Sequence, residues 1–392
     1  MKRIILLILC AVMLSAFITA CGASDNSTDY YWDPPSDGSS DNAASSGDGA
    51  SSDNNGINKH GVDYEAAFAA FAPDTVMLVA GDYTVKWSEL YFSLRSVLNS
   101  LISNYGELPD LSELMPEGIP YYEAVLNYAI DNAMVYRAIE YGAKKSGVTL
   151  SEDDHDYLKE EYGSIVDSYG GMDEFLNTLW EEDGISNFDL FYYLYSIPYL
   201  AELTFKELYG ADGALIPDEE AAAQTASAGY IMAKHILRLK TEDGDDTPMR
   251  EAEDILELLD NYDGEDFESF FDSMMYEYSE DAGGLSSFPN GYLFQYGDMV
   301  PEFYDACIAL EAGSYSGLVE TTYGFHIVYK LPVNYDEIPM YNYNQYDYRP
   351  LRGIVAQEMF NDNISEWVDL HVPEHTAEFD SMDITQIFKK MG

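Results

Sequence analysis

Two strand-like segments, residues 231–239 and 318–331, each hold one histidine, His235 and His326. Short apolar runs bounded by polar and glycine-rich stretches are typical of buried strands. The chain between them shows helical patterns over residues 248–259, 267–275 and 301–310. Strands at both ends of a helical stretch predict an α+β unit, in which two segments distant in sequence share one sheet.

Helical periodicity also marks the chain from residue 63 to residue 228, most clearly over residues 121–145. Ser151 followed three residues later by Asp154 predicts a capped helix start. Ser186 is expected to cap a long aromatic helix further along the chain.

A last helix is expected over residues 351–370, and an isolated amphipathic helix needs a surface to pack on. We expect that surface to be the all-α domain of residues 63–228, which contains one strand-like run at residues 76–79. The α+β unit, residues 229–333, would then be inserted in the helical domain, or else appended to it. Residues 334–392 form the connector and the carboxyl-terminal helix.

Three motifs lie between the two histidines. The acidic turn at Asp281 comes first, a glycine pair at Gly283 follows, and Met299 and Phe303 flank a proline further on. In this order, the motifs from residue 230 to residue 332 resemble the parvulin family of peptidyl-prolyl isomerases. Family members usually carry Gly-Gly-Asp-Leu-Gly-x-Phe before the pocket methionine, and here the corresponding segment and its spacing are altered.

The resemblance implies a four-stranded sheet flanked by helices, and a role for each matched residue. The two histidines would pair at the centre of the sheet, joined by a threonine hydroxyl, while an aspartate faces the substrate carbonyl. The implied catalytic residues are His235, Asp281, Thr321 and His326. The implied proline pocket has Met299 and Phe303 on its floor, with Leu293 or Phe294 as a third wall.

Isomerisation of an X-Pro bond makes particular demands on an enzyme. The rotation faces a barrier of about 18–20 kcal/mol, because resonance gives the amide double-bond character. No bond is made or broken, so neither a nucleophile nor a cofactor is needed. The enzyme needs an apolar cup for the ring and polar groups that favour the twisted amide. Met299 and Phe303 lie four residues apart at a helix start and can face one pocket, and Asp281 near the carbonyl would weaken the resonance.

Each of these residues also has a structural interpretation. The histidines could orient the site and stabilise the sheet, or act directly on the proton or carbonyl. Asp281 could be one more solvated carboxylate, and Phe303 could belong only to the core. Cys307 falls on an apolar helical stripe with Phe303 and is expected to be a core residue.

The amino terminus predicts export. A basic start and an apolar run make residues 1–20 a secretory signal peptide. The small residues before Cys21 resemble a bacterial lipobox, which implies lipidation of Cys21; the alternative is a cysteine in a buried helix. Residues 21–62 are rich in Ser, Asp, Asn and Gly and predict a disordered acidic tether. We expect a protein anchored by lipid on the extracytoplasmic face of a membrane, at a Gram-positive-type cell surface.

The formal net charge of −52 excludes several partners. Nucleic acid is a poor partner, because phosphate binding needs clustered Lys and Arg. The loop at residues 241–246 is acidic, so a specificity for phosphoserine before proline is excluded as well. No spacing of ligands predicts a calcium or zinc site, and a zinc site on the two histidines would lack a third ligand.

The sequence therefore predicts a parvulin-type peptidyl-prolyl isomerase and foldase of the PrsA/SurA type. Its partners would be unfolded or nascent secreted proteins that contain X-Pro bonds. The alternative is a non-catalytic holdase with a degenerate parvulin domain. The oligomeric state and the client proteins are open at this point.

Overall fold

The structure, a computed structural model, describes residues 61–116, 118–241 and 245–389. The predicted signal peptide, Cys21 and the tether up to residue 60 lie outside the described residues, as do residues 242–244 of the acidic loop. The chain divides into two compact units: one holds the residues up to Thr204 and those from Asn361 onward, and the other is Phe205–Phe360. No helix among the described residues combines the length and the apolar character that crossing a membrane requires.

The first unit is mostly helical. Its helices are α2 (Tyr64–Phe68), α3 (Trp87–Tyr105), α4 (Tyr121–Lys145), α5 (Glu152–Ser168), α6 (Met172–Asp183), most of α7 (Phe188–Tyr209), α15 (Ala377–Asp380) and α16 (Ile384–Ile387). Ser151 and Asp154 form the predicted capping box of α5. The predicted cap of α7 is wrong by one residue: Asn187, not Ser186, accepts the backbone N–H of Leu190 at 2.9 Å.

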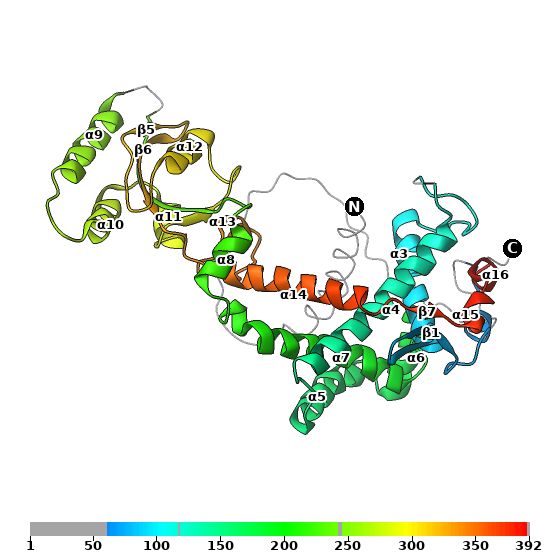
Figure 1. Ribbon diagram of the computed structural model, residues 1–392. Coiled ribbons are helices and arrows are strands. Elements are labelled where there is room, and N and C mark those ends of the chain that lie inside the picture. Colours follow the sequence, from blue (N-terminus) through cyan, green and yellow to red (C-terminus); the bar gives the residue numbers. More distant parts are fainter. Residues whose placement is uncertain (1–60, 117, 242–244, 390–392) are drawn as a thin grey trace. The chain divides into compact units, whose positions relative to one another are not determined.

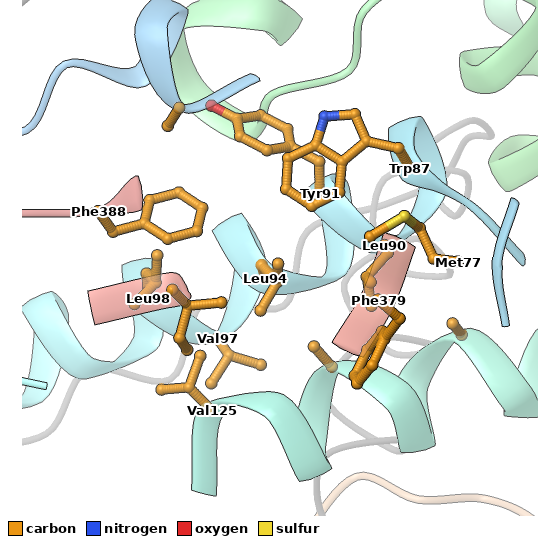
Figure 2. Close-up of a cluster of buried hydrophobic side chains, with 14 of the residues drawn as sticks. Met77, Trp87, Leu90, Tyr91, Leu94, Val97, Leu98, Val125, Phe379 and Phe388 are labelled. Carbon is orange, nitrogen blue, oxygen red and sulfur yellow. The ribbon is translucent and has the colours of Figure 1, made fainter. Parts of the chain in front are cut away.

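Helix α3 supplies the centre of this unit's core. Its fully buried side chains recur at helical spacing, and they are Trp87, Leu90, Tyr91, Leu94 and Leu98. Figure 2 shows them beside Val125 of α4 and beside two rings from the carboxyl-terminal segment, Phe379 and Phe388. Burying an aromatic or aliphatic side chain of this size contributes about 1.5–3 kcal/mol. Phe379 and Phe388 therefore help to close the core around α3, almost 300 residues earlier in the sequence.

A small antiparallel sheet completes the first unit. Strands β2 (Tyr83–Lys86), β1 (Val76–Ala80) and β7 (Glu374–His375) lie side by side in that order. The register pairs Leu78 with His375, so β7 comes from the far end of the chain. The strand-like run at residues 76–79 is thus confirmed, and the structure adds two partners for it.

The second unit contains the sheet that the two histidines predict. Its elements are the end of α7, the 3-10 helix η1 (Ala211–Gly213), α8 (Asp218–Thr225), β3 (Ile231–Leu239), α9 (Thr247–Asp260), α10 (Phe267–Tyr278), α11 (Ala282–Ser287), β4 (Tyr292–Phe294), α12 (Pro301–Ala309), β5 (Val319–Glu320), β6 (Gly324–Leu331), α13 (Met340–Asn344) and the start of α14 (Leu351–Asp369). The strand order is β4-β3-β6-β5, and every pair is antiparallel. The predicted α+β class and four-stranded sheet are confirmed, while α11 and β4 were not anticipated from the sequence.

Helices cover both faces of this sheet (Figure 1). On one face Phe303 of α12 packs with Ala233 and Val328. On the other face Phe271 of α10 lies 5.1 Å from the ring of Tyr329. Because side chains alternate along a strand, odd-numbered residues of β3 face α12 and even-numbered ones face α9 and α10.

Helix α14 contributes to both units, because the division falls between Phe360 and Asn361. In the second unit Arg352 donates to the carbonyl of Ile216 at 2.6 Å and to Asp218 at 2.6 Å. In the first unit Trp367 packs so closely on α4 that a methyl group added at Gly142 would lie 2.0 Å from its ring.

Candidate active site

The register of the central strand pair brings the two histidines together. Strands β3 and β6 pair Leu237 with His326 and His235 with Val328, which sets the histidines diagonally on one face of the sheet. Their rings stack with centroids 5.1 Å apart, and the two Nδ1 atoms are 2.9 Å apart. Both side chains are buried.

Thr321, directly after β5, extends this pair on one side. Its buried hydroxyl lies 2.8 Å from Nε2 of His326 and accepts the backbone N–H of Tyr323 at 3.1 Å. The structure thus brings together the threonine and the histidine that the parvulin resemblance joins.

Asp281 extends the pair on the other side. It is the N-cap of α11, where its Oδ1 accepts the backbone N–H of Gly284 at 2.9 Å. Its Oδ2 lies 2.8 Å from Nε2 of His235. A side chain that caps a helix start has a fixed position, so α11 holds this carboxylate at the end of the histidine pair.

Tyr292 is a fifth side chain in this network, and the sequence did not reveal it. Its hydroxyl donates to Oδ2 of Asp281 at 2.6 Å, and its ring packs on Phe288 with centroids 4.7 Å apart. Gly284 makes the approach possible, since a methyl group there would lie 2.3 Å from Oδ2 of Asp281 and 2.4 Å from the tyrosine hydroxyl. The only signal in the sequence was the altered segment after the glycine pair, and that signal does not say where the tyrosine points.

One arrangement of protons satisfies the whole network with both histidines neutral. A carboxylate accepts only, so His235 donates from Nε2 to Asp281 and accepts at Nδ1. His326 must then donate from Nδ1 and accept at Nε2, and Thr321 donates to it. Every donor has an acceptor, and the one formal charge lies on Asp281.

The pKa values follow from these contacts. Hydrogen bonds from His235, Tyr292 and Gly284 outweigh burial and hold the pKa of Asp281 well below its usual range. Burial and the neighbouring His235 lower the pKa of His326 to about 3. Burial and the adjacent carboxylate raise the pKa of Tyr292. Near neutral pH, Asp281 is therefore ionised, while His326 is neutral and Tyr292 keeps its proton.

A cluster of apolar side chains lies beside the two histidines. The ring of Phe303 meets His235 and His326 edge to face, with centroid distances of 5.2 and 5.5 Å. Phe303 and Phe294 are almost fully buried, at 2% and 0% exposure, and Met299 packs against them half-buried.

Strand β4 places the two candidates for the third pocket wall on opposite faces of the sheet. Phe294 pairs with Ile231 and joins the cluster of Phe303, whereas Leu293 pairs with Met232 and takes the opposite face. The structure therefore brings Phe294, and not Leu293, to Met299 and Phe303.

Cys307 lies in the same cluster, fully buried, as predicted for a core residue. Burial raises the pKa of its thiol to about 12. The thiol is therefore protonated near neutral pH and belongs to the packing of α12 on the sheet.

Residues 235–331 match the Rotamase family, described as the PPIC-type PPIASE domain. This segment is a parvulin domain. The match runs from His235 to Leu331 and so includes every residue of the polar network.

Two curated proteins similar to part of this chain are foldase proteins named PrsA. The one from Oceanobacillus iheyensis is 29% identical over 173 residues, which cover 44% of this chain and 50% of that protein. The one from Halalkalibacterium halodurans is 29% identical over 214 residues, which cover 53% of this chain and 57% of that protein. The chain is thus distantly related to PrsA foldases and spans about half the length of the curated relatives it matches.

A crystal structure of the peptidylprolyl isomerase PrsA from Bacillus cereus is also similar. It is 19% identical in sequence, with 79% of this chain and 96% of that chain covered, at a TM-score of 0.27.

Proposed function

We propose that the parvulin domain isomerises X-Pro peptide bonds without covalent chemistry. The observation that carries the proposal is the ionised carboxylate of Asp281, held by His235 at the end of a buried network beside Met299 and Phe303. Catalysis of amide rotation needs an apolar surface that holds the proline ring and a charged group near the carbonyl that precedes proline. A carboxylate fixed next to apolar side chains provides both.

Asp281 would act on the carbonyl that precedes proline. Amide resonance places negative charge on the carbonyl oxygen, and a carboxylate nearby opposes that charge. The carboxylate removes more resonance stabilisation from the planar amide than from the twisted amide, because the twisted amide has little resonance left. The barrier to rotation therefore falls. Asp281 keeps its charge because His235 and Tyr292 donate to it, and these donors do not leave during the rotation.

The two histidines serve as positioning residues in this proposal. His326 and Thr321 fix the orientation of His235, which in turn holds Asp281. A neutral pair needs no proton transfer, in agreement with a reaction that neither makes nor breaks a bond.

The wider role is that of a foldase and chaperone for secreted proteins. The distant relationship to PrsA foldases supports it. In this proposal Cys21 carries the lipid anchor, the tether spaces the domains from the extracytoplasmic face of the membrane, and unfolded secreted chains are the clients. The proposed domains are the helical chaperone domain of residues 63–228, the parvulin domain of residues 229–333, and a carboxyl-terminal segment that returns to the helical domain.

The test is an isomerisation assay on a short X-Pro peptide. Asp281→Asn keeps the shape and removes the charge, so we expect a loss of about 100-fold in kcat/KM, the size typical of a lost electrostatic contact. Met299→Ala removes part of the ring seat and should mainly raise KM. An Asp281→Asn variant as active as the wild type would refute the electrostatic role.

A non-catalytic holdase is the second candidate. The observation that favours it is the burial of Phe294 and Phe303, which leaves the half-buried Met299 as the most accessible of the three pocket side chains. A wild-type protein that suppresses aggregation of an unfolded client but shows no isomerisation would establish this alternative.

A further inference from the structure

We propose that a groove in the first unit binds extended client segments in which a carboxylate lies beside an aromatic or aliphatic side chain. This inference rests on the proposed chaperone function and names the client chemistry that the helical unit would capture. The groove is lined by the β1–β2 turn, the end of α4 and the segment after α14. Its volume is about 620 Å³, and its lining residues include Tyr83, Tyr141, Lys144, Lys145 and His371.

The size of the groove suits a ligand. Pockets that hold small molecules or peptide side chains are about 300–1,000 Å³. The volume here falls in that range, whereas the small cavity beside Asp281 is about 10 Å³ and has room for about one water.

Three rings form a fixed wall. His371 meets Tyr141 edge to face at 4.5 Å and Tyr83 at 5.4 Å between centroids. Its Nδ1 lies 2.7 Å from the carbonyl oxygen of Trp367, which orients the imidazole. Trp367 in turn lies directly on Gly142 of α4, so the wall is set by tight packing.

The rim of the groove is apolar and open to solvent. Leu370 and Val372 line it and are 64% and 74% exposed. Exposed aliphatic side chains next to an aromatic wall offer a place for an apolar side chain that an unfolded protein exposes.

Two lysines give the groove a positive charge, which favours apolar segments that also carry a carboxylate. Lys144 and Lys145 lie in the last turn of α4. Among the residues that the structure describes, neither ammonium group has a carboxylate within ion-pair distance, and Lys145 lies 6.0 Å from the ring centre of Tyr141. Asp82 is the one carboxylate that lines the groove. The two adjacent lysines give this apolar groove a local positive charge in a chain with a net charge of −52, and they complement a client carboxylate.

The experiment measures binding of fluorescent peptides that contain no proline, so that the parvulin domain is not their target. The probe repeats Phe-Asp in a Gly-Ser background. Matched peptides replace Asp by Asn or Phe by Ala. We expect the Phe-Asp peptide to bind best, and its affinity to fall as salt is raised.

Two double variants of the full chain test the lysines and the apolar rim of the groove separately. Lys144→Glu with Lys145→Glu should weaken binding of the Phe-Asp peptide about tenfold and should leave the Phe-Asn peptide little changed. Leu370→Ser with Val372→Ser should reduce the difference in affinity between the Phe-Asp peptide and the matched peptide in which Ala replaces Phe. The control is Lys159→Glu with Lys389→Glu, which changes the net charge equally at two exposed lysines outside the groove.

The outcomes separate this inference from the proposed isomerase. If the Phe-Asp peptide binds the Lys144→Glu, Lys145→Glu variant as tightly as the wild type, the groove is not the site and the inference fails, whatever the isomerase assay shows. If the wild type instead binds vesicles of anionic lipid, or associates with itself, through these lysines, a client segment is not the occupant and the inference also fails. Loss of isomerisation alone, with peptide binding intact, overturns the catalytic proposal and leaves the groove standing.

Discussion

Each unit contains a partly buried network of polar side chains, and the two networks differ in which groups surround their central charged residue. In the first unit Arg137 of α4 is paired with Glu89 of α3, donates to Glu140 at 2.7 Å and lies 2.6 Å from the hydroxyl of Tyr193 on α7. In the parvulin domain Asp281 accepts hydrogen bonds from His235, Tyr292 and the backbone of Gly284, and neither a Lys nor an Arg contacts it among the described residues.

In our proposal this difference separates a structural network in the first unit from a functional one in the parvulin domain. The charge of Arg137 is matched by two partly buried carboxylates, so the network ties α3, α4 and α7 together and has little left to offer a ligand. Burial even raises the pKa of Glu89 against the effect of Arg137. The charge of Asp281 is stabilised by hydrogen bonds without a Lys or Arg partner, and in the proposed mechanism it acts on a carbonyl group. Four changes test this contrast, from the largest expected effect to the smallest.

Arg137→Met should destabilise the first unit by about 3 kcal/mol, the low end of the range for a buried ion pair, because it leaves two partly buried carboxylates without their cation. Isomerisation of a short peptide should be unchanged. Trp87 and Trp180 lie in or against this unit's core, so tryptophan fluorescence in urea reports its unfolding. Lys159→Met is the control, since this exposed side chain on α5 should change stability by less than about 0.5 kcal/mol. An unchanged urea midpoint in Arg137→Met would show that the network does not hold the helices.

Gly284→Ala should lower the isomerisation rate by about 100-fold, because the new methyl group would occupy the space where Tyr292 meets Asp281. Gly283→Ala is a matched control in the same helix, since its methyl group would come no closer than 3.7 Å to Asp281. Equal activity in the two variants would mean that the position of the carboxylate is not critical.

His326 should make stability depend on pH. Its pKa of about 3 in the folded protein lies below the usual value of 6.5, so the unfolded chain binds the proton more readily. The stabilisation is complete above pH 6.5 and declines as the pH falls towards 3, by up to about 1.4 kcal/mol per pH unit. Asp281, with its lowered pKa, loses its own contribution only in more acidic solution, as the pH falls below its usual value near 4. The free energy of unfolding, measured in urea, should differ less between pH 7 and pH 5 in His326→Asn than in the wild type. An equal difference in the two proteins would show that His326 is not the source of the pH dependence.

Tyr292→Phe should have the smallest effect. It removes one donor to Asp281 and leaves the ring on Phe288, so we expect a stability loss of about 1 kcal/mol. Activity should fall only a few-fold, since His235 and Gly284 still hold the carboxylate. The pH at which activity declines in acid should rise, because Asp281 loses a hydrogen bond that favours its charged form. A variant with an unshifted acid limb would show that the tyrosine does not support the charge.

Much of the parvulin domain could be predicted from local sequence. Strand β3 follows the predicted residues 231–239, and α12 starts at Pro301 as expected. The resemblance also named His235, Asp281, Thr321 and His326, which the structure brings into one chain of hydrogen bonds. Their roles stay predictions until the variants are measured.

Other features depend on pairings that no local pattern encodes. Phe294 and Leu293 are equally apolar neighbours, and only the register of β4 against β3 decides which one faces Phe303. Tyr292 reaches Asp281 because α11 and β4 pack together with a glycine between them.

The sequence by itself determined most of the long helices, the central strands β3 and β6, and the identity of the parvulin domain, because periodicity and motif order are properties of neighbouring residues. The tertiary structure alone decided which polar groups share a proton network and that β7 pairs with β1, almost 300 residues away in the sequence. It also placed two unpaired lysines beside an aromatic wall. These features arise from strand register and close packing between distant segments, where a shift of one residue turns a side chain to the other face.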